Sequence, residues 1–242
     1  FRSFLAAELG VNDLNVLSWD IMCHDLTPSS SLGRNQEFYA APRIDNLASC
    51  HAALEALMNV ETVESNTISA VVLFDHEEIG SESSTGARGP MLSHALERLA
   101  DTRAVSREQF LRALSRSACV SADGAHAVHP NYVDRHEPEH QVALNGGPVI
   151  KLNANVRYAT DAESSALFQS ACRSAGVPFQ QYAHRSNLAC GSTIGPITAA
   201  QLGMMVVDVG SPQLSMHSAR EMAGASDPAY LTAALNTFLS DG

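Results

Sequence analysis

Four short stretches of the sequence combine acidic and histidine side chains in ways that could bind metal ions and move protons. They are Arg43-Ile44-Asp45-Asn46, Asp75-His76-Glu77-Glu78, Ser121-Ala122-Asp123 with His126 and His129 shortly after it, and Ser215-Met216-His217. Carboxylates and imidazoles are suitable ligands for cations such as Zn²⁺, Co²⁺ and Mn²⁺. A carboxylate shared by two cations, with further ligands on each, is typical of a two-metal hydrolase.

Each stretch also has an ordinary structural interpretation. Asp45 precedes a predicted helix and could cap it, adjacent glutamates are usually part of a solvated turn, and a single histidine is more often structural than a ligand. The joint placement of the stretches favours the metal site. Glu77 and Glu78 follow one apolar strand-like run, Asp123 follows a second, and His217 follows a third. In an α/β sheet, ligands bind beyond the carboxyl ends of the strands.

The elements that must position these residues alternate along the chain. Leu47, Cys50, Leu54 and Leu57 recur at helical spacing, which predicts a helix that carries all four on one face. Further helices are predicted at 1–9, 90–99, 106–114, 162–174 and 228–239, and strands at 15–23, 68–74, 118–121, 149–152, 177–182 and 204–209. Alternating helices and largely apolar strands predict an α/β fold with a covered, mixed and largely parallel central sheet.

The composition excludes several classes of protein. The 242 residues are 45% hydrophobic and 17% charged, and Lys+Arg 15 against Asp+Glu 26 gives a formal net charge of −11. Such a chain folds, and its acidic balance argues against nucleic acid or an anionic membrane as the main partner. No apolar run reaches the roughly 18 residues of a membrane-spanning helix. The five cysteines are widely spaced, so we expect reduced thiols in a cytoplasmic protein.

Other catalytic motifs are absent from the sequence. It contains no Gly-x-Ser-x-Gly elbow, no phosphate-binding Gly-x-x-x-x-Gly-Lys-Ser/Thr loop, no Gly-x-Gly-x-x-Gly and no His-Glu-x-x-His. Cys190-Gly191-Ser192-Thr193 is more typical of a glycine turn than of a nucleophile. Metal-assisted hydrolysis is therefore the chemistry that the residues favour most.

Seven longer motifs occur in order between about Leu32 and Met222. They are Arg43-Ile44-Asp45-Asn46-Leu47, Asp75-His76-Glu77-Glu78-Ile79-Gly80-Ser81-Glu82-Ser83, Ser121-Ala122-Asp123, Ala125-His126-Ala127-Val128-His129-Pro130-Asn131-Tyr132, Gly147-Pro148-Val149-Ile150-Lys151, Cys190-Gly191-Ser192-Thr193-Ile194-Gly195-Pro196, and Gly210-Ser211-Pro212-Gln213-Leu214-Ser215-Met216-His217-Ser218-Ala219-Arg220-Glu221. Together they resemble the aspartyl aminopeptidases, the M18 family of zinc metallopeptidases. Several long motifs in one chain are far more specific than any single carboxylate.

The resemblance implies a three-layer αβα metallopeptidase domain with two Zn²⁺ per subunit, Co²⁺ and Mn²⁺ being alternatives. Its metal ligands would be Asp45, bridging both ions, with Glu78 and His217 on one and Asp123 on the other. Glu77 would be the general base, and a water held between the metals would attack the peptide bond. The substrate-binding residues would be His126, Tyr158 and Lys151. The first two would donate to the scissile carbonyl or the tetrahedral intermediate, and the lysine would pair with the carboxylate of an N-terminal Asp or Glu.

The resemblance also implies a domain division and an assembly. Residues 1–26 would be the tail of an inserted dimerisation domain, and residues 27–242 would form the catalytic domain. The polar stretch at 27–33 is the natural boundary. The family forms homo-oligomers, tetrahedral dodecamers built from dimers, so we expect peptides and further copies of the chain as partners, with no nucleic acid and no membrane.

One family motif has no counterpart here. The family carries a further metal histidine in a His-x-Asp motif on an early strand, and this sequence contains no His-x-Asp. His24-Asp25 lacks the spacer. The chain starts with Phe1 and has no signal peptide, so we expect it to be part of a longer protein with that motif upstream. The second metal would then have only Asp45 and Asp123 from this chain and would bind poorly to it.

Two rival interpretations remain. A related dizinc amidohydrolase, such as a deacylase, or a broad-specificity aminopeptidase would use the same ligands. A non-catalytic homologue could retain the fold as a peptide-binding or shell protein. The intact set of Asp45, Glu77, Glu78, Asp123 and His217 argues against the second, since an inactive homologue usually loses the base or a ligand.

Overall fold

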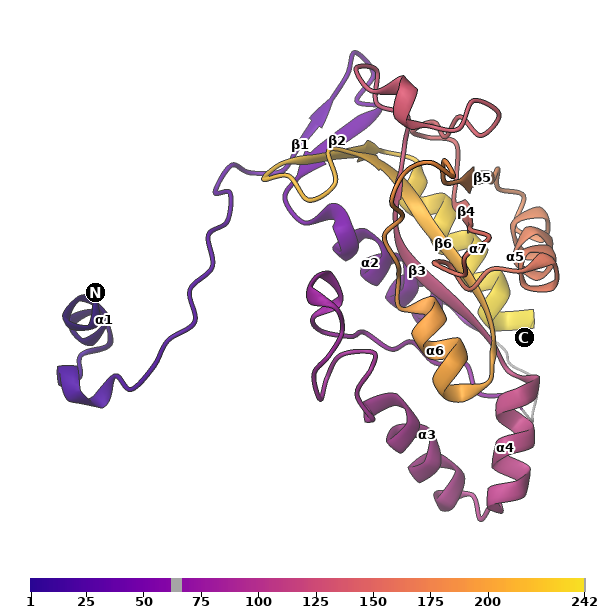
Figure 1. Cartoon of the computed structure of the whole chain (residues 1–242), viewed down its shortest axis with the longest axis horizontal. Helices are drawn as coiled ribbons and strands as arrows, with labels where there is room; N and C mark the ends of the chain where they lie inside the picture. Colours follow the sequence, from indigo (N-terminus) through magenta and orange to yellow (C-terminus); the bar gives the residue numbers. More distant parts are fainter. Residues whose placement is uncertain (62–66, 242) are drawn as a thin grey trace.

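A mixed sheet forms the centre of the protein in the computed structural model, which describes residues 1–61 and 67–241. Its order is β1-β2-β7-β6-β4-β5, with β3 paired to β6. The strands are β1 (Ser30–Leu32), β2 (Phe38–Ala41), β3 (Ala118–His126), β4 (Val149–Leu152), β5 (Gln180–Ala183), β6 (Met205–Leu214) and β7 (Glu221–Gly224). Figure 1 shows the long strands β3 and β6 side by side in the middle of the molecule.

The sheet combines parallel and antiparallel pairings, and the antiparallel pair β4–β6 lies between the two parallel ones. β3 pairs with β6 in parallel from Ala118 opposite Met205 to His126 opposite Gln213, and β4 pairs with β5 in parallel. The pairs β1–β2, β2–β7, β6–β7 and β4–β6 are antiparallel. The predicted mixed sheet is therefore confirmed, with its longest pairing parallel and an antiparallel edge formed by β1, β2 and β7.

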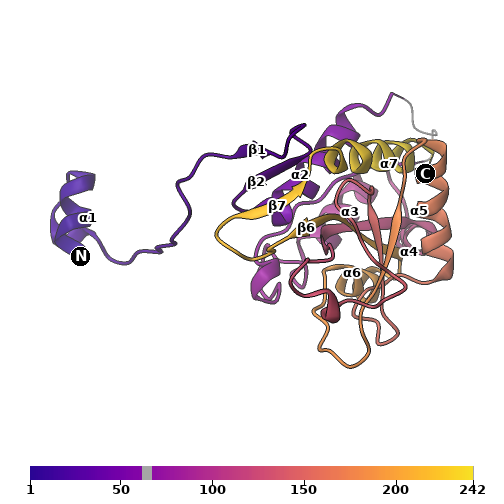
Figure 2. The ribbon, with the colours of Figure 1, turned by 90° about the horizontal axis from the view of Figure 1, so that it is seen from above.

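Helices cover both faces of the sheet. The helices of the described residues are α1 (Arg2–Leu9), α2 (Ile44–Met58), α3 (Met91–Thr102), α4 (Arg107–Arg116), α5 (Ala162–Ser174), α6 (Gly195–Leu202) and α7 (Asp227–Asp241). Of these, α1 stands apart from the sheet (Figure 1). The main core joins α2, α5 and α7 to β4 and β6 through residues such as Phe168, Ile150 and Leu231, all fully buried. Figure 2 shows α7 and α6 on opposite sides of β6. The predicted αβα layering is confirmed.

At the starts of α5 and α4, local hydrogen bonds explain why the helix positions predicted from the sequence agree with the structure. The Asp161 carboxylate accepts a hydrogen bond from Ser164 N at 2.8 Å, and Asp161 N donates to Ser164 Oγ at 3.0 Å. Ser106 and Gln109 form the same reciprocal arrangement at the start of α4. Each capping box satisfies backbone donors that the first helical turn leaves free. These local bonds can be recognised from sequence, because they depend on residues only three positions apart.

Three sequence predictions differ from the structure. Leu47 and Leu54 share a face of α2 as expected, but they are 60% and 43% exposed, and the small residues Ala52 and Ala56 face the core instead. Residues 15–23 and 68–74 form no strand. A strand needs a hydrogen-bonded neighbour, and neither apolar run has one among the described residues.

Residues 1–24 reach away from the body of the protein (Figure 1), whereas the Arg220 guanidinium holds Asp25, Thr27 and Pro28 against it. α1 and the segment after it project to one side in both ribbon views (Figures 1 and 2). Large apolar side chains on this arm are exposed, including Leu17 at 83% and Met22 at 85%. None of the helices in residues 1–61 and 67–241 is long and apolar enough to cross a membrane.

Candidate metal centre

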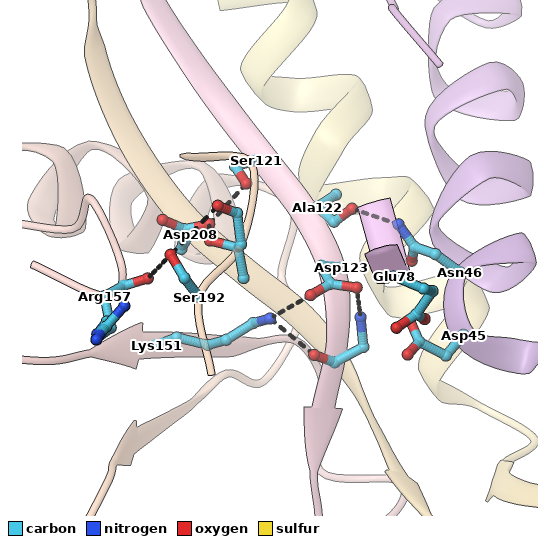
Figure 3. Close-up of polar contacts among 12 residues, drawn as sticks. Asp45, Asn46, Glu78, Ser121, Ala122, Asp123, Lys151, Arg157, Ser192 and Asp208 are labelled. Atoms are coloured by element: carbon cyan, nitrogen blue, oxygen red, sulfur yellow. Dashed lines mark hydrogen bonds and ion pairs between the residues drawn. The ribbon is translucent and has the colours of Figure 1, made fainter. Parts of the chain in front are cut away.

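Three side chains from distant parts of the sequence converge at one end of the sheet. His217 Nε2 lies 3.2 Å from Asp45 Oδ2 and 3.0 Å from Glu78 Oε2. The ligand atoms of the three residues all lie within 4.8 Å of one another. Figure 3 shows the Asp45 and Glu78 carboxylates turned toward the same point, next to β3. The structure thus brings together three of the four residues expected to bind metal.

Each of these residues occupies an irregular piece of backbone. Asp45 lies at the start of α2, where its φ of −79° and ψ of 111° depart from the helix. Glu78 belongs to a 3₁₀ turn, η2 (Glu77–Ile79), and His217 lies between β6 and β7 with a φ of 64°. Irregular backbone of this kind aims side chains into a shared space that regular helices and strands would not direct them to.

Glu221, the first residue of β7, holds two of these segments together. Its Oε2 accepts a hydrogen bond from Asp45 N at 2.9 Å, and its Oε1 accepts one from His217 N at 2.8 Å. The side chain is buried, with 2% of the residue exposed. One carboxylate therefore fixes the backbone of two candidate ligands at once.

Glu221→Gln is expected to weaken zinc binding about 10- to 100-fold, the usual effect of losing a residue that orients ligands. The amide group can accept only one of the two backbone N–H bonds and places its own donors against the other. Competition with a chromophoric chelator measures the Kd. Glu163→Gln, an exposed change in α5, is the matched control. Equal zinc affinity in both variants would show that Glu221 does not position the ligands.

Asp123, the fourth expected ligand, lies on β3 and faces both the acidic cluster and a lysine. Its Oδ2 accepts from Lys151 Nζ at 3.1 Å, and its Oδ1 accepts from Gly124 N at 2.7 Å. Lys151 also donates to Gly124 O at 2.7 Å and is 3% exposed (Figure 3). Burial alone would raise the pKa of Asp123, but the Lys151 ammonium and these hydrogen bonds lower it below its ordinary value.

Negative charge accumulates around Asp45. Burial first, and then the charges of Asp123 and Glu78, raise the pKa of the Asp45 carboxyl to about 8. Asp45 Oδ1 is buried and has no hydrogen-bond partner among the described residues. Carboxylates this close repel one another unless a cation or a proton lies between them. Oxygen and imidazole donors with an unpaired buried oxygen fit a divalent cation such as Zn²⁺.

Glu77 lies beside this cluster but is not part of the three-residue group. It lines a cleft of about 180 Å³ together with Glu78, Asp123, His126, Lys151 and Tyr158. Burial, followed by the charges of Asp123 and Glu78, raises the pKa of Glu77 to about 7. A carboxyl with such a pKa exchanges protons readily near neutral pH, which suits a general base.

The other two expected substrate contacts are hydrogen-bond donors in the same cleft. Desolvation of the ring, and then the Lys151 charge, lower the pKa of His126 to about 4, so the imidazole stays neutral with one N–H. Burial, and then the hydrogen bond and charge of Cys190, raise the pKa of the Tyr158 phenol, which keeps its proton. The Lys151 ammonium lies 5.4 Å from the centre of the Tyr158 ring.

Asp208, which the sequence analysis did not single out, organises the far wall of the cleft. Its carboxylate accepts from Ser121 Oγ, Thr193 Oγ1 and Ala159 N, each at 2.6 Å, and the residue is fully buried. Figure 3 shows it between the segments that carry Ser121 and Ser192. A Cβ on Gly195 would lie 2.1 Å from this carboxylate, so only glycine fits there. The sequence signal that could have identified Asp208 was the presence of an acidic residue within the apolar run at 204–209.

Comparisons with known proteins agree on one family. The family model described as "Aminopeptidase I zinc metalloprotease (M18)" matches residues 1–239. A Mycobacterium tuberculosis (strain ATCC 25618 / H37Rv) relative, "Probable M18 family aminopeptidase 2", is 50% identical over 246 residues, which cover 99% of this chain and 57% of the relative. A Streptomyces coelicolor relative of the same description is 48% identical, over 98% of this chain and 55% of the relative. The chain spans little more than half the length of these curated relatives.

Solved structures give the same picture. The "Structure of S. cerevesiae mApe1 dodecamer" is 31% identical with a TM-score of 0.84, and the match covers 98% of this chain and 53% of that chain. An M18 family aminopeptidase from Thermotoga maritima has a TM-score of 0.87 over 99% of this chain and 54% of that chain. At 23% identity, the second likeness supports the fold alone.

Proposed function

The chain belongs to the M18 family of zinc metalloaminopeptidases, and from this premise we propose that the protein removes N-terminal residues, acidic ones above all, from peptides. The observation that carries the proposal is the convergence of Asp45, Glu78 and His217 beside Glu77. That arrangement supplies metal ligands and a base in one cleft. It favours hydrolysis over the alternative of a non-catalytic homologue.

The ligands and the base of the proposed site would have different roles. Asp45 would hold both of two zinc ions, Glu78 and His217 the first of them, and Asp123 the second. When bound, zinc supplies Lewis-acid chemistry, which polarises the scissile carbonyl and makes a nearby water more acidic. The Glu77 carboxylate would take a proton from the attacking water and deliver it to the leaving amine.

The neutral donors of the cleft would act on the developing oxyanion. The His126 ring carries one N–H near neutral pH and Tyr158 keeps its phenolic proton, so both can donate to the scissile oxygen as negative charge builds on it. Glu221 and Asp208 would keep the ligands and the cleft wall in place before substrate arrives, because both are buried and fully engaged.

The proposed preference for Asp and Glu rests on Lys151. An ammonium has three N–H donors. Two point at Asp123 Oδ2 and Gly124 O, and the residue lines the cleft, so one donor remains for a substrate carboxylate. The remaining N–H selects for a carboxylate and against an apolar side chain, which would leave this donor without a partner.

Lys151→Met is expected to lower the ratio of kcat/KM for an Asp anilide to that for a Leu anilide at least tenfold, the effect of losing one charge-assisted hydrogen bond. All substrates would slow, because Asp123 also loses its partner, and the ratio isolates the recognition of charge. The wild-type measurement with Asp, Glu, Leu and acetyl-amino-acid amides tests the proposal itself. A preference for Leu would contradict acidic specificity, and a preference for the acetyl amide would indicate a deacylase.

We also propose that the protein is a homo-oligomer in which residues 1–26 belong to a dimerisation domain. The projecting arm exposes Leu17, Met22 and other apolar side chains that a partner surface could cover. The similar mApe1 structure is described as a dodecamer. The proposal also includes the binding of two zinc ions by each subunit.

A further inference from the structure

A second hollow adjoins the proposed catalytic cleft. It has a volume of about 350 Å³, and its walls come from the end of β3, the loop that follows, and the end of β6. His126 belongs to the lining of both cavities. The two spaces therefore share one wall residue, the one proposed to contact the scissile bond.

The lining of this hollow carries one permanent cation, the Arg135 guanidinium, and several hydrogen-bond donors. It includes His129, Arg135 and His136 and contains no carboxylate, although the whole chain has a net charge of −11. Among the described residues no salt bridge joins Arg135 to an acid. The nearby Glu137 pairs with His140 at 2.6 Å instead. An unpaired guanidinium in a hollow is suited to a carboxylate ligand.

Two buried polar atoms of the lining residues also lack partners. His136 Nδ1 and Gln213 Nε2 make no hydrogen bond to the described part of the chain, and Gln213 is 1% exposed. Buried polar groups are normally satisfied, so unpaired ones next to a cavity indicate a ligand or ordered water. His136 lines the hollow and could donate to an oxygen placed there, whereas Gln213 Nε2 lies 3.2 Å from where a Cβ on Gly124 would stand, on the side of Asp45 Oδ1.

The loop that carries Arg135 is anchored at several points. Ala127 N donates to Gln213 O at 3.0 Å and Val128 N to Val142 O at 2.9 Å. The short turn η3 (Val133–Arg135) is held by the Arg185 guanidinium, which donates to Asp134 O. The hollow is thus a built feature, with its cationic side chain presented by a fixed turn.

The path of a substrate through the two spaces follows from their order. The cleft with Glu77, Lys151 and Tyr158 takes the N-terminal residue in the proposed function. A peptide with its scissile bond at His126 must send its remaining residues out of that cleft, and the neighbouring hollow is also lined by His126. We propose that this hollow binds the first residues of the leaving peptide and recognises a carboxylate there through Arg135. This inference rests on the proposed aminopeptidase function.

The test uses the native, metal-loaded protein and substrates that share the N-terminal residue it cleaves fastest. After that residue, the first peptide carries Ala with a free C-terminus, the second carries Ala amide and the third carries Glu amide. A fourth substrate, a neutral anilide, has no leaving peptide. At least one carboxylate-bearing peptide is expected to exceed the Ala amide about tenfold in kcat/KM, mainly through KM. Faster cleavage of the free-Ala peptide would show that the hollow recognises a C-terminal carboxylate. Faster cleavage of the Glu amide would show that it recognises a side-chain carboxylate.

Arg135→Met is expected to bring the preferred carboxylate peptide down to the level of the Ala amide and to leave the anilide unchanged. Arg135→Lys should restore part of the preference because it keeps the charge, and Arg98→Met, an exposed change on α3, should have no effect. Equal rates for all three peptides in the wild type would overturn the proposal, as would an equal loss on every substrate in Arg135→Met. Hydrolysis of the anilide reports on the proposed function separately.

Discussion

Glu77→Gln is expected to lower kcat for peptide hydrolysis by about 10²- to 10⁴-fold, the usual contribution of a general base. Glutamine has nearly the same shape as glutamate but cannot take up a proton. Glu77 lies outside the group formed by Asp45, Glu78 and His217, so the variant should still bind zinc. Steady-state kinetics and the zinc content of the purified protein, measured together, separate loss of the base from loss of metal.

A control for this variant lies four residues after Glu78. Glu82→Gln makes the same chemical change at a side chain that is 80% exposed and lies 3.7 Å from Arg88. It should retain wild-type kcat. If Glu77→Gln hydrolyses peptides at a rate close to that of Glu82→Gln, Glu77 is not the base. If Glu77→Gln loses zinc, the residue acts through the metal site instead.

Asp45→Asn is expected to abolish the thermal stabilisation that zinc gives to the protein. Asp45 lies 3.2 Å from His217 and interacts with both Asp123 and Glu78, and an amide is a much weaker ligand for zinc than a carboxylate. A ligand that binds only the native state stabilises it by RT ln(1 + L/Kd), where L is the free ligand concentration, and thereby raises Tm. Differential scanning calorimetry with and without zinc measures this shift.

The metal-free protein should respond to Asp45→Asn in the opposite direction. Because Asp45 is buried beside Asp123 and Glu78, its folded pKa of about 8 exceeds that of an ordinary carboxyl. Above the pKa of an ordinary carboxyl, Asp45 must take up a proton as the chain folds, so this residue lowers stability at neutral pH, and asparagine avoids that cost. The Tm of the metal-free variant should equal or exceed that of the wild type. Asp101→Asn, an exposed change in α3, should leave the zinc response intact, and an intact response in Asp45→Asn would show that Asp45 is not a ligand.

Elements defined by local interactions could be predicted from the sequence closely. The predicted ranges 149–152 and 162–174 coincide with β4 and α5, since an apolar run and a capping box mark them. The short strands β1, β2 and β7 were missed, because they lack the β-branched apolar residues that mark β4 and depend on their neighbours. Residues 68–74 show the reverse case, an apolar run with no partner strand in the described structure.

In the candidate site, too, some residues could be identified from the sequence and others could not. Asp45, Glu77, Glu78, Asp123 and His217 could be selected because acids and a histidine next to strand ends are conspicuous. Glu221 could not be assigned a role, since its importance comes from two backbone N–H groups, one of them 176 residues away along the chain. The hydrogen bonds from Lys151 to Asp123 and Gly124 likewise depend on tertiary structure. Sequence patterns identify reactive groups better than the buried groups that hold them.

Anomalous diffraction tests the central claim, that Asp45, Glu78 and His217 hold zinc, most directly. Crystals of the protein grown with zinc would be measured on both sides of the zinc absorption edge. We expect an anomalous peak within about 2.0–2.2 Å of a carboxylate oxygen of Asp45, a carboxylate oxygen of Glu78 and a ring nitrogen of His217. The absence of zinc from these three residues, or its presence on a different set of ligands, would contradict the account.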